Sequence, residues 1–506
     1  MTDPLSLDWC APAYAFAPLV GEPGAHLFHG GEGRASARWS FIVAAPTSEV
    51  TLQSGVVFIN GAKTSLSLVA ALRQLQDALR ASAMEAATST VSASLSPPDT
   101  PPFTYGLAGF MGYEAAAVFE PSLVIPPSPF DLPDVCFGAY EAVAAFDRQK
   151  KRVLVHGVSK TAIGALVNRL DLETDQSDSA RDKDERDTSQ GDPFLLTDSQ
   201  CNFSRATFME AVNATRDAIL RGDIFQANIT RQIAMRAAAV HGTAFEAAFA
   251  VYGRTVAKTD AAHAAFLQGA KGIILSNSPE RFFCTRRKGD NQLDVRVEPI
   301  KGTIARGKTP EADAALADAL RTSEKDRAEN IMIADLLRND LSRVCLPESV
   351  REDDICAILS LTYVHHLVSR ISGTLEPGLD SFDALAALFP CGSITGAPKI
   401  EAMTVIAARE KIGRGPYCGA IGYMNHDGSS DFSVAIRTMM IDQLGEDGAC
   451  RLTMPVGGGI TLNSNPAAEY EETVLKALGL STGLSATLPP DHSAASPRAA
   501  PGGWPA

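Results

Sequence analysis

The chain lacks the features that mark disulfide-rich, zinc-finger and membrane proteins. Its nine cysteines are scattered over 506 residues and none forms a CxxC pair, so neither a disulfide framework nor a zinc knuckle is indicated. No segment reaches the roughly 18 apolar residues that a membrane span needs. The N-terminus has no basic segment followed by an apolar one. We therefore expect a cytoplasmic protein with no membrane partner.

Positive charge is also scarce. The 45 lysines and arginines are outnumbered by 59 aspartates and glutamates, which gives a net charge of −14. Nucleic acid attracts proteins through a basic face, so we expect no nucleic-acid partner. A small anionic substrate is compatible with this balance, because it needs only a local cationic pocket.

Three stretches are expected to be disordered or loosely held. Residues 84–102 are rich in Ala, Ser, Thr and Pro, residues 173–193 are almost wholly polar and cannot bury apolar surface, and residues 481–506 are rich in Pro, Ala and Ser. The second is expected to be a disordered linker between an N-terminal region, 1–172, and a C-terminal region, 194–480. The third is expected to be a disordered tail. Short apolar runs and turns alternate in the N-terminal region, which predicts a mostly antiparallel sheet. Helical and strand patterns mix in the C-terminal region, so the chain has an α+β plan.

Two segments show clear periodicity. Apolar residues recur at helical spacing after Ser204, a possible N-cap, and predict a helix from about 205 to 220. Residues 431–441 alternate as in a strand, with Phe432 on one face and Arg437 on the other.

Residues 324–340 have a helical pattern that is apolar on nearly all sides, which is typical of a buried helix. The same segment carries Asp326 and Glu329 one turn apart on one face. Burying a carboxylate costs several kcal/mol of lost hydration. These side chains therefore need a partner, either an arginine such as Arg327 or Arg338, or a metal ion.

A second helix, expected to stop at Gly479, aligns Glu469, Glu472 and Lys476 on one stripe. One interpretation is an exposed Glu472–Lys476 ion pair at i, i+4. The other is an oxygen-rich site for Mg²⁺, shared with the two carboxylates of the preceding helix. No cluster of histidines and cysteines competes for a softer metal.

Two further signals are ambiguous by themselves. Gly457–Gly459 follow a predicted strand, and the run is either a plain turn or a set of amides that bind an anion. Lys301, in VEPIKGTIARG, lies between a Pro-Ile pair and a Gly-Thr turn signal. It is either a solvated loop lysine or a functional lysine in a pocket.

Nine short motifs, in order along the chain, resemble those of the chorismate-binding enzymes. This family includes anthranilate, aminodeoxychorismate, isochorismate and salicylate synthases, and the resemblance covers about residues 200–478. The motifs are SPERF (278–282), PIKGT (299–303), KDRAENIMIADLLRND (325–340), HHLVS (365–369), FPCGSITGAPKIEAM (389–403), RGPYCGAIGY (414–423), AIRT (435–438), GGGI (457–460) and EYEETVLKA (469–477).

The resemblance implies two facing antiparallel β-sheets in a sandwich, with helices outside and a deep site between them. It implies chorismate as substrate and Mg²⁺ as cofactor. Glu329 and Glu472 would bind the metal, with Asp326 and Glu469 in support through water. The metal would hold the ring carboxylate of chorismate.

The resemblance also implies roles around the substrate. Glu280 would protonate the departing C4 hydroxyl, although an ion pair with Arg281 is the alternative. Residues expected to bind substrate are His366, Ser393, Tyr417, Arg437, Gly457, Gly458, Gly459 and Lys476.

Two positions discriminate among family members. Gln226 stands where isochorismate and salicylate synthases have a lysine base, and glutamine cannot deprotonate water. Lys301 stands where anthranilate synthases have alanine, and it resembles the lysine proposed to attack C2 of chorismate in aminodeoxychorismate synthases. Such a lysine needs a partly desolvated pocket to act as a nucleophile. Glu298, close in sequence, would oppose this unless its carboxylate points away.

The expected activity is therefore Mg²⁺-dependent conversion of chorismate and ammonia to 4-amino-4-deoxychorismate, as in component I of aminodeoxychorismate synthases, on the route to p-aminobenzoate and folate. The alternatives are an anthranilate synthase large component and a non-catalytic subunit that binds Mg²⁺ and chorismate. No cysteine lies in a G-x-C-x-G elbow. We therefore expect a separate glutamine amidotransferase to supply the ammonia.

Overall fold

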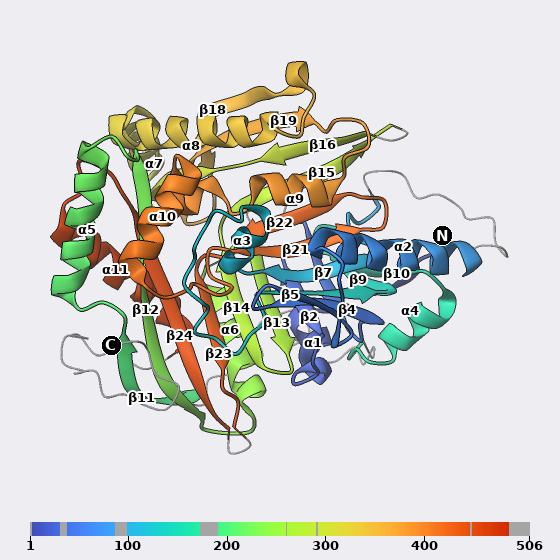
Figure 1. The fold of residues 1–506 in the computed structure, drawn as a ribbon. Helices are drawn as coiled ribbons and strands as arrows, with labels where there is room; N and C mark the ends of the chain where they lie inside the picture. Colours follow the sequence, from blue (N-terminus) through green and yellow to red (C-terminus); the bar gives the residue numbers. More distant parts are fainter. Residues whose placement is uncertain are drawn as a thin grey trace.

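The computed structural model describes residues 3–30, 38–86, 99–172, 191–259, 261–289, 292–445 and 448–484. Two antiparallel sheets of 12 strands each form its centre, and helices lie around them (Figure 1). The α+β sandwich implied by the family resemblance is confirmed.

Most of the three stretches expected to be disordered lie outside the described residues. The described parts include the end of helix α2 at Ala86 and a short 3₁₀ turn at Ser481–Gly483. Leu484 after this turn is 5% exposed. The first residues after 480 are therefore packed against the protein.

The first sheet, sheet A, combines strands from both predicted regions. Leu27 of β2 lies opposite Phe266 of β13, so the N-terminal and C-terminal regions share this sheet. Its neighbouring strands are, in order, β1 (Leu5–Asp8), β10 (Arg152–Gly157), β9 (Ala142–Asp147), β3 (Trp39–Val43), β2 (His26–His29), β13 (His263–Gly269), β14 (Gly272–Ser278), β23 (Thr438–Asp442), β24 (Ala449–Ile460), β12 (Gln226–Ala239) and β11 (Phe194–Cys201), with β20 (Gly396–Ala397) paired to β12.

Sheet B mixes the two regions in the same way. Gly109 of β7 lies opposite Gly422 of β21. Its neighbouring strands are, in order, β17 (Ile300–Ala305), β19 (Val364–Thr374), β16 (Gln292–Val297), β15 (Arg281–Lys288), β22 (Ser430–Val434), β21 (Ala420–Asn425), β7 (Gly106–Met111), β8 (Val135–Tyr140), β4 (Ser48–Gln53), β5 (Val56–Ile59) and β6 (Ala62–Lys63), with β18 (Arg351–Ser360) paired to β19.

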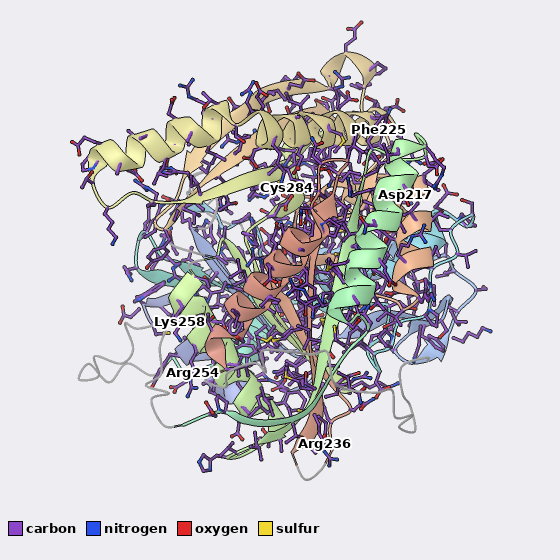
Figure 2. All side chains as sticks on the ribbon, turned by 90° about the vertical axis from the view of Figure 1, so that its left-hand side faces the viewer. Asp217, Phe225, Arg236, Arg254, Lys258 and Cys284 are labelled. Carbon is purple, nitrogen blue, oxygen red and sulfur yellow. The ribbon has the colours of Figure 1, made fainter. Side chains whose placement is uncertain are left out.

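The helices surround both sheets, and Figure 2 shows α5 and α11 side by side on one flank. The rings of Phe208 and Tyr470 join these two helices at 6.0 Å. Ser204 caps α5 as predicted. In the described part of the chain no helix is both long and apolar enough to cross a membrane. The helices are α1 (Pro12–Phe16), α2 (Leu68–Ala86), α3 (Ala116–Phe119), α4 (Lys160–Val167), α5 (Arg205–Leu220), α6 (Ala244–Thr259), α7 (Pro310–Thr322), α8 (Glu324–Ser342), α9 (Ser381–Leu388), α10 (Lys399–Glu410) and α11 (Pro466–Leu480).

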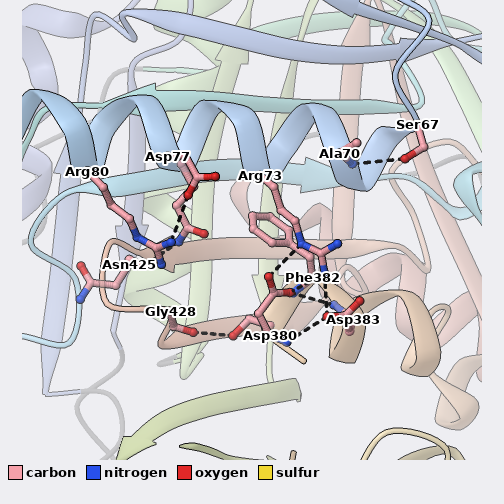
Figure 3. A network of polar contacts seen from close by, with 12 residues as sticks. Ser67, Ala70, Arg73, Asp77, Arg80, Asp380, Phe382, Asp383, Asn425 and Gly428 are labelled. Atoms are coloured by element: carbon pink, nitrogen blue, oxygen red, sulfur yellow. Dashed lines mark hydrogen bonds and ion pairs between the residues drawn. The ribbon is translucent and has the colours of Figure 1, made fainter. Parts of the chain in front are cut away.

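A polar network fastens α2 to the C-terminal region (Figure 3). Arg73 donates to Asp380 at 2.9 Å and to Asp383 at 2.6 Å. Asp380 in turn caps the N-terminus of α9. Arg80 donates to the main-chain oxygen of His426 at 2.7 Å. These contacts hold an N-terminal helix against loops that follow strands of sheet B.

The single strand predicted over residues 431–441 is wrong. The chain forms β22 in sheet B, leaves it after Val434, and enters β23 in sheet A at Thr438. Arg437 lies at this crossing with φ of 52°. The sequence does not reveal such a crossing, because apolar residues alternate with the same two-residue period before and after it.

The prediction that α8 is buried on all sides is also wrong. Its inner face packs on sheet B through Ile333 and Leu337, whereas Ile331 is 46% exposed. Arg338 pairs with Asp335 and Glu352 on the outer surface and does not pair with Asp326 or Glu329, which are only partly buried. No further layer covers this face among the described residues, so its apolar side chains meet solvent.

Candidate active site

A cavity of about 670 Å³ lies between the two sheets, within the size range of small-molecule sites. Strands β12 and β24 of sheet A, strands β17 and β19 of sheet B, the start of α8 and one face of α11 contribute to its walls. Every residue predicted for the site lines it, namely Glu280, Lys301, Asp326, Glu329, His366, Ser393, Tyr417, Arg437, Gly457, Gly458, Gly459, Glu469, Glu472 and Lys476.

Lys301 is half-buried in the wall formed by β17. Its Nζ donates a hydrogen bond to the main-chain oxygen of Ser393 at 3.0 Å. Gly302 follows it with φ of 78°, and a Cβ there would come within 3.0 Å of Asp326. Glycine at this position therefore lets the lysine strand pass close to the start of α8.

Glu298 points away from Lys301. Its carboxylate accepts a hydrogen bond from Arg281 at 3.0 Å. Arg281 also donates to both carboxylate oxygens of Asp431, at 2.8 and 3.0 Å. Burial opposes the charge of Asp431, but the Arg281 guanidinium brings the pKa of Asp431 down to about 2. Glu298 is thus paired with Arg281, has Arg370 3.9 Å away, and forms no ion pair with Lys301 among the described residues.

Glu280 is 5% exposed and lies at the end of the loop before β15. The main-chain N–H of Ile300 approaches its Oε1 at 3.4 Å. Arg281, the alternative partner considered for Glu280, is held by Asp431 and Glu298 instead. Glu280 is thus a buried carboxyl group that lines the cavity beside the lysine strand.

Four carboxylates converge on the cavity from two helices. Burial raises the pKa of Glu329 and of Glu469. Burial acts in the same direction on Glu472, but the adjacent Lys476 ammonium outweighs it and lowers the pKa of Glu472. Asp326 accepts a hydrogen bond from Ser323, the N-cap of α8, at 2.5 Å.

The donor set fits a hard divalent cation such as Mg²⁺, because all four groups are carboxylates. Among the residues that the structure describes, no three side chains are close enough to form a ready-made metal site. A Cβ added at Gly458 would lie 3.2 Å from Glu469 Oε2 and 3.8 Å from Glu472 Oε1. Glycine therefore leaves open the space toward which both carboxylates point.

Replacing Gly458 by alanine is expected to weaken Mg²⁺ binding about tenfold, because the new methyl group would displace the carboxylate of Glu469. Calorimetric titration of the protein with MgCl₂ measures this directly. A glycine with a positive φ, such as Gly428 with φ of 90°, is unsuitable as a control, because alanine would strain its backbone. Gly253→Ala in α6, where a Cβ meets nothing within 4 Å, is the matched variant. Equal Mg²⁺ affinity in both variants would contradict the assignment.

The Glu472–Lys476 ion pair predicted at i, i+4 is present at 2.7 Å. Lys476 also donates to the main-chain oxygen of Gly457 at 2.6 Å. The pair therefore faces the cavity and links α11 to β24. Gly479, expected to stop this helix, lies inside it, because α11 continues to Leu480.

The three glycines form part of strand β24 and not a turn after it. Gly457, Gly458 and Gly459 pair with residues 230, 229 and 228 of β12. On its other edge β24 pairs with β23 only as far as Thr453, so in the described sheet this edge is open beside the glycines. Those glycine amides that point to this edge, and not to β12, are available to a ligand carboxylate.

Arg437 and Tyr417 come from two loops with unusual backbone geometry. Arg437 has φ of 52°, and Cys418 after Tyr417 has φ of 63°. Within the described residues Arg437 forms no ion pair, although it lines the cavity. Burial raises the pKa of Tyr417 well above its usual value, so this phenol is a neutral donor. A free guanidinium beside a neutral hydroxyl suits an anionic ligand.

His366 lies on β19 and is 7% exposed. Its Nδ1 is 2.8 Å from Oγ1 of Thr303, two residues after Lys301 on β17. Ser393 is 3% exposed, and its hydroxyl lies 3.3 Å from the thiol of Cys391. Both predicted contact residues are thus held by neighbours before any ligand binds.

Sequence reasoning missed several residues around the cavity. Asn228 and Lys325 line it. Asn228 stands in an otherwise ordinary strand, so no periodic signal singles it out. A buried ion pair between Arg414 and Glu410, at 2.6 Å, supports the wall behind it. A glutamate followed four residues later by an arginine is typical of an exposed ion pair on a helix. No local sequence pattern indicates that this pair is buried.

Comparison with known proteins agrees with this geometry. Residues 32–481 match the family described as chorismate binding enzyme. Aminodeoxychorismate synthase component 1 of Klebsiella aerogenes is 34% identical over 482 residues, covering 93% of this chain and 96% of that protein. Anthranilate synthase component 1 of Synechocystis is 33% identical over 402 residues, covering 76% and 77% respectively.

Solved structures agree with the fold. The crystal structure of anthranilate synthase component I from Streptococcus pneumoniae TIGR4 matches with a TM-score of 0.70 and 28% identity, over 88% of this chain and 92% of that one. The family match spans most of the sequence, and the motif-based resemblance is confirmed. The chain belongs to the chorismate-binding enzymes.

Proposed function

We propose that this protein converts chorismate and ammonia to 4-amino-4-deoxychorismate, with Lys301 as a covalent nucleophile. The observation that carries the proposal is the presence of a lysine amine in the cavity wall, beside a buried carboxyl group and in the same cavity as four further carboxylates. The relatives named aminodeoxychorismate synthase component 1 support the same product.

The chain's residues suit a two-step substitution. Nζ of Lys301 would bond to C2 of chorismate, the two ring double bonds would shift, and the C4–O bond would break. Glu280 would give its proton to the leaving hydroxyl, which departs as water. Ammonia would then bond to C4, the double bonds would shift back, and the C2–N bond would break to release the neutral lysine. The new C4 ammonium would return one proton to Glu280.

The other residues would bind and orient the substrate. Arg437 and Tyr417 would hold the enolpyruvyl carboxylate, and His366 would contact the ring. Mg²⁺, held by Glu329 and Glu472 with Asp326 and Glu469 in support, would neutralise the ring carboxylate. Lys476 and the amides of Gly457–Gly459 would complete that anion site.

Ammonia would come from a separate glutamine amidotransferase subunit. The matched relatives are named as a first component, which implies a second one for those proteins. Free ammonium at high concentration would replace this partner in a test, because ammonia itself is the proposed co-substrate.

Product analysis tests the proposal. The purified protein would be incubated with chorismate, MgCl₂ and ammonium at alkaline pH, and the products would be separated by liquid chromatography with mass detection. We expect a non-aromatic product one mass unit lighter than chorismate, which added lyase converts to p-aminobenzoate. Fluorescent anthranilate with free pyruvate would instead establish the anthranilate synthase reaction, which the 33% identical relative favours. Unchanged chorismate would indicate a non-catalytic subunit.

A further inference from the structure

Lys301 shares its hydrogen-bond acceptor with a second side chain. The main-chain oxygen of Ser393 accepts from Lys301 Nζ and from Asn228 Nδ2, each at 3.0 Å. Asn228 belongs to β12 of sheet A, and Lys301 belongs to β17 of sheet B. One carbonyl group therefore joins the two walls of the cavity through two side chains.

The orientation of the Asn228 amide follows from its surroundings. A carbonyl oxygen can only accept, so the NH₂ group of Asn228 must face Ser393. The other end, Oδ1, faces Gly459, where an added Cβ would lie 3.0 Å away. Gly459 is the cross-strand partner of Asn228. The last glycine of the run therefore makes room for this asparagine.

The carbonyl group of Ser393 sits in a segment tied to β12. The main-chain N–H of Asn228 donates to Thr395 O at 2.8 Å, and Arg414 donates to Ile394 O at 3.3 Å. Strand β20, directly after, pairs with the start of β12. With Asn228 Nδ2 on its oxygen, the Ser393 carbonyl is fixed in direction before substrate arrives.

We propose that Asn228 is a positioning residue for Lys301, acting through the Ser393 carbonyl to aim the lysine amine into the cavity. An N–H bond of the amine points at the carbonyl oxygen, so the lone pair of the neutral amine points elsewhere. Without Asn228 the carbonyl loses its second donor and can turn. The amine of Lys301 would then no longer have one fixed direction in the cavity. The proposal rests on the proposed function of Lys301.

The first test measures formation of the covalent intermediate. Protein would be mixed with chorismate and MgCl₂ without ammonia, quenched at intervals, and analysed by intact mass for a gain of chorismate less one water. In Asn228→Leu we expect adduct formation to slow about 100-fold, the cost of a small misplacement of a reacting group. The KM for chorismate should change less than about threefold, because Asn228 acts on the lysine and not on the substrate.

Two further variants separate positioning from general damage. Asn228→Asp keeps the shape but removes the NH₂ donor, and we expect it to slow adduct formation as Asn228→Leu does. Asn202→Leu removes an asparagine that holds the main chain of β12 at Gln232, 2.8 Å away and outside the cavity. We expect this control to form adduct at the wild-type rate. Wild-type adduct rates in both Asn228 variants would overturn the proposal.

A second measurement does not depend on chorismate chemistry. Acetic anhydride at limiting concentration would label the lysines of the unliganded protein, and peptide mass analysis would compare Lys301 with exposed Lys160. We expect the relative labelling of Lys301 to change at least about threefold in Asn228→Leu. Unchanged labelling would overturn the proposal. If the wild-type protein forms no adduct but its Lys301 labelling depends on Asn228, the covalent step fails and the positioning role stands.

Discussion

Replacing Lys301 by alanine is expected to lower the rate of aminodeoxychorismate formation by about 10³-fold or more, because the variant loses the nucleophile that divides the substitution into two steps. The neighbouring groups should stay in place, since the hydrogen bond found for the lysine amine among the described residues goes to a main-chain oxygen, that of Ser393. Mg²⁺-dependent chorismate binding should therefore persist. Product formation by mass detection and chorismate binding by calorimetry would measure the two effects separately.

Lys301→Arg distinguishes a nucleophile from a simple cation. Arginine keeps the charge and nearly the length, but its guanidinium is always protonated and does not attack carbon. We expect Lys301→Arg to be as slow as Lys301→Ala. Substantial activity in the arginine variant would mean that the position supplies charge alone. Wild-type activity in the alanine variant would remove the covalent mechanism and leave direct attack by ammonia.

The chemistry of the cavity could be predicted from the sequence because it is concentrated in short motifs. Glu329 and Glu472 lie on regular helices whose register follows from helical periodicity, so their side chains point where the spacing indicates. Lys301 and Glu280 were found through motif resemblance, because neither has a periodic signal. Their convergence on one cavity depends on how the two sheets face each other, which no local pattern encodes.

The parts that were not predicted depend on contacts between distant segments. The crossing from β22 to β23 needs a positive φ at Arg437, and arginine gives no local hint of that conformation. The glycine run is a turn or an anion-binding set of amides by its sequence, and neither interpretation places it inside a strand whose close packing against β12 requires glycine. The exposed face of α8 follows from the absence of a further layer over it among the residues that the structure describes. Each outcome is set by tertiary packing that overrides the local signal.

The charges of the site are arranged in two layers. Behind the wall, Asp431 and Glu298 share Arg281, and each has a second arginine nearby, Arg286 and Arg370 respectively. The groups that line the cavity, such as Arg437, can still form ion pairs or hydrogen bonds with a ligand. Because Glu298 is already paired with arginine, it does not hinder the proposed nucleophile. We call the ion pairs behind the wall the rear layer, and they support the geometry of the groups that line the cavity.

The rear-layer pair Arg414–Glu410 should therefore be a large determinant of stability. Both side chains are 1% exposed. Arg414 donates to Asn228 O at 2.7 Å, and Glu410 accepts from Thr230 N at 2.8 Å. Arg414→Met would leave Glu410 buried without its counter-charge. We expect the free energy of unfolding, measured by urea denaturation, to fall by about 3–5 kcal/mol.

The double variant Arg414→Met, Glu410→Leu separates two contributions to the free energy of unfolding: the penalty of a buried unpaired charge and the stabilisation that the ion pair itself provides. If the cost comes from the stranded carboxylate, the double variant should recover most of the lost stability, because the buried charge is gone. Its cavity wall would still lack the hydrogen bonds to Asn228 and Thr230. We therefore expect restored stability without restored rate of Lys301 adduct formation. Recovery of both would show that the ion pair serves folding alone, whereas recovery of neither would mean that the hydrogen bonds themselves hold this part of the fold together.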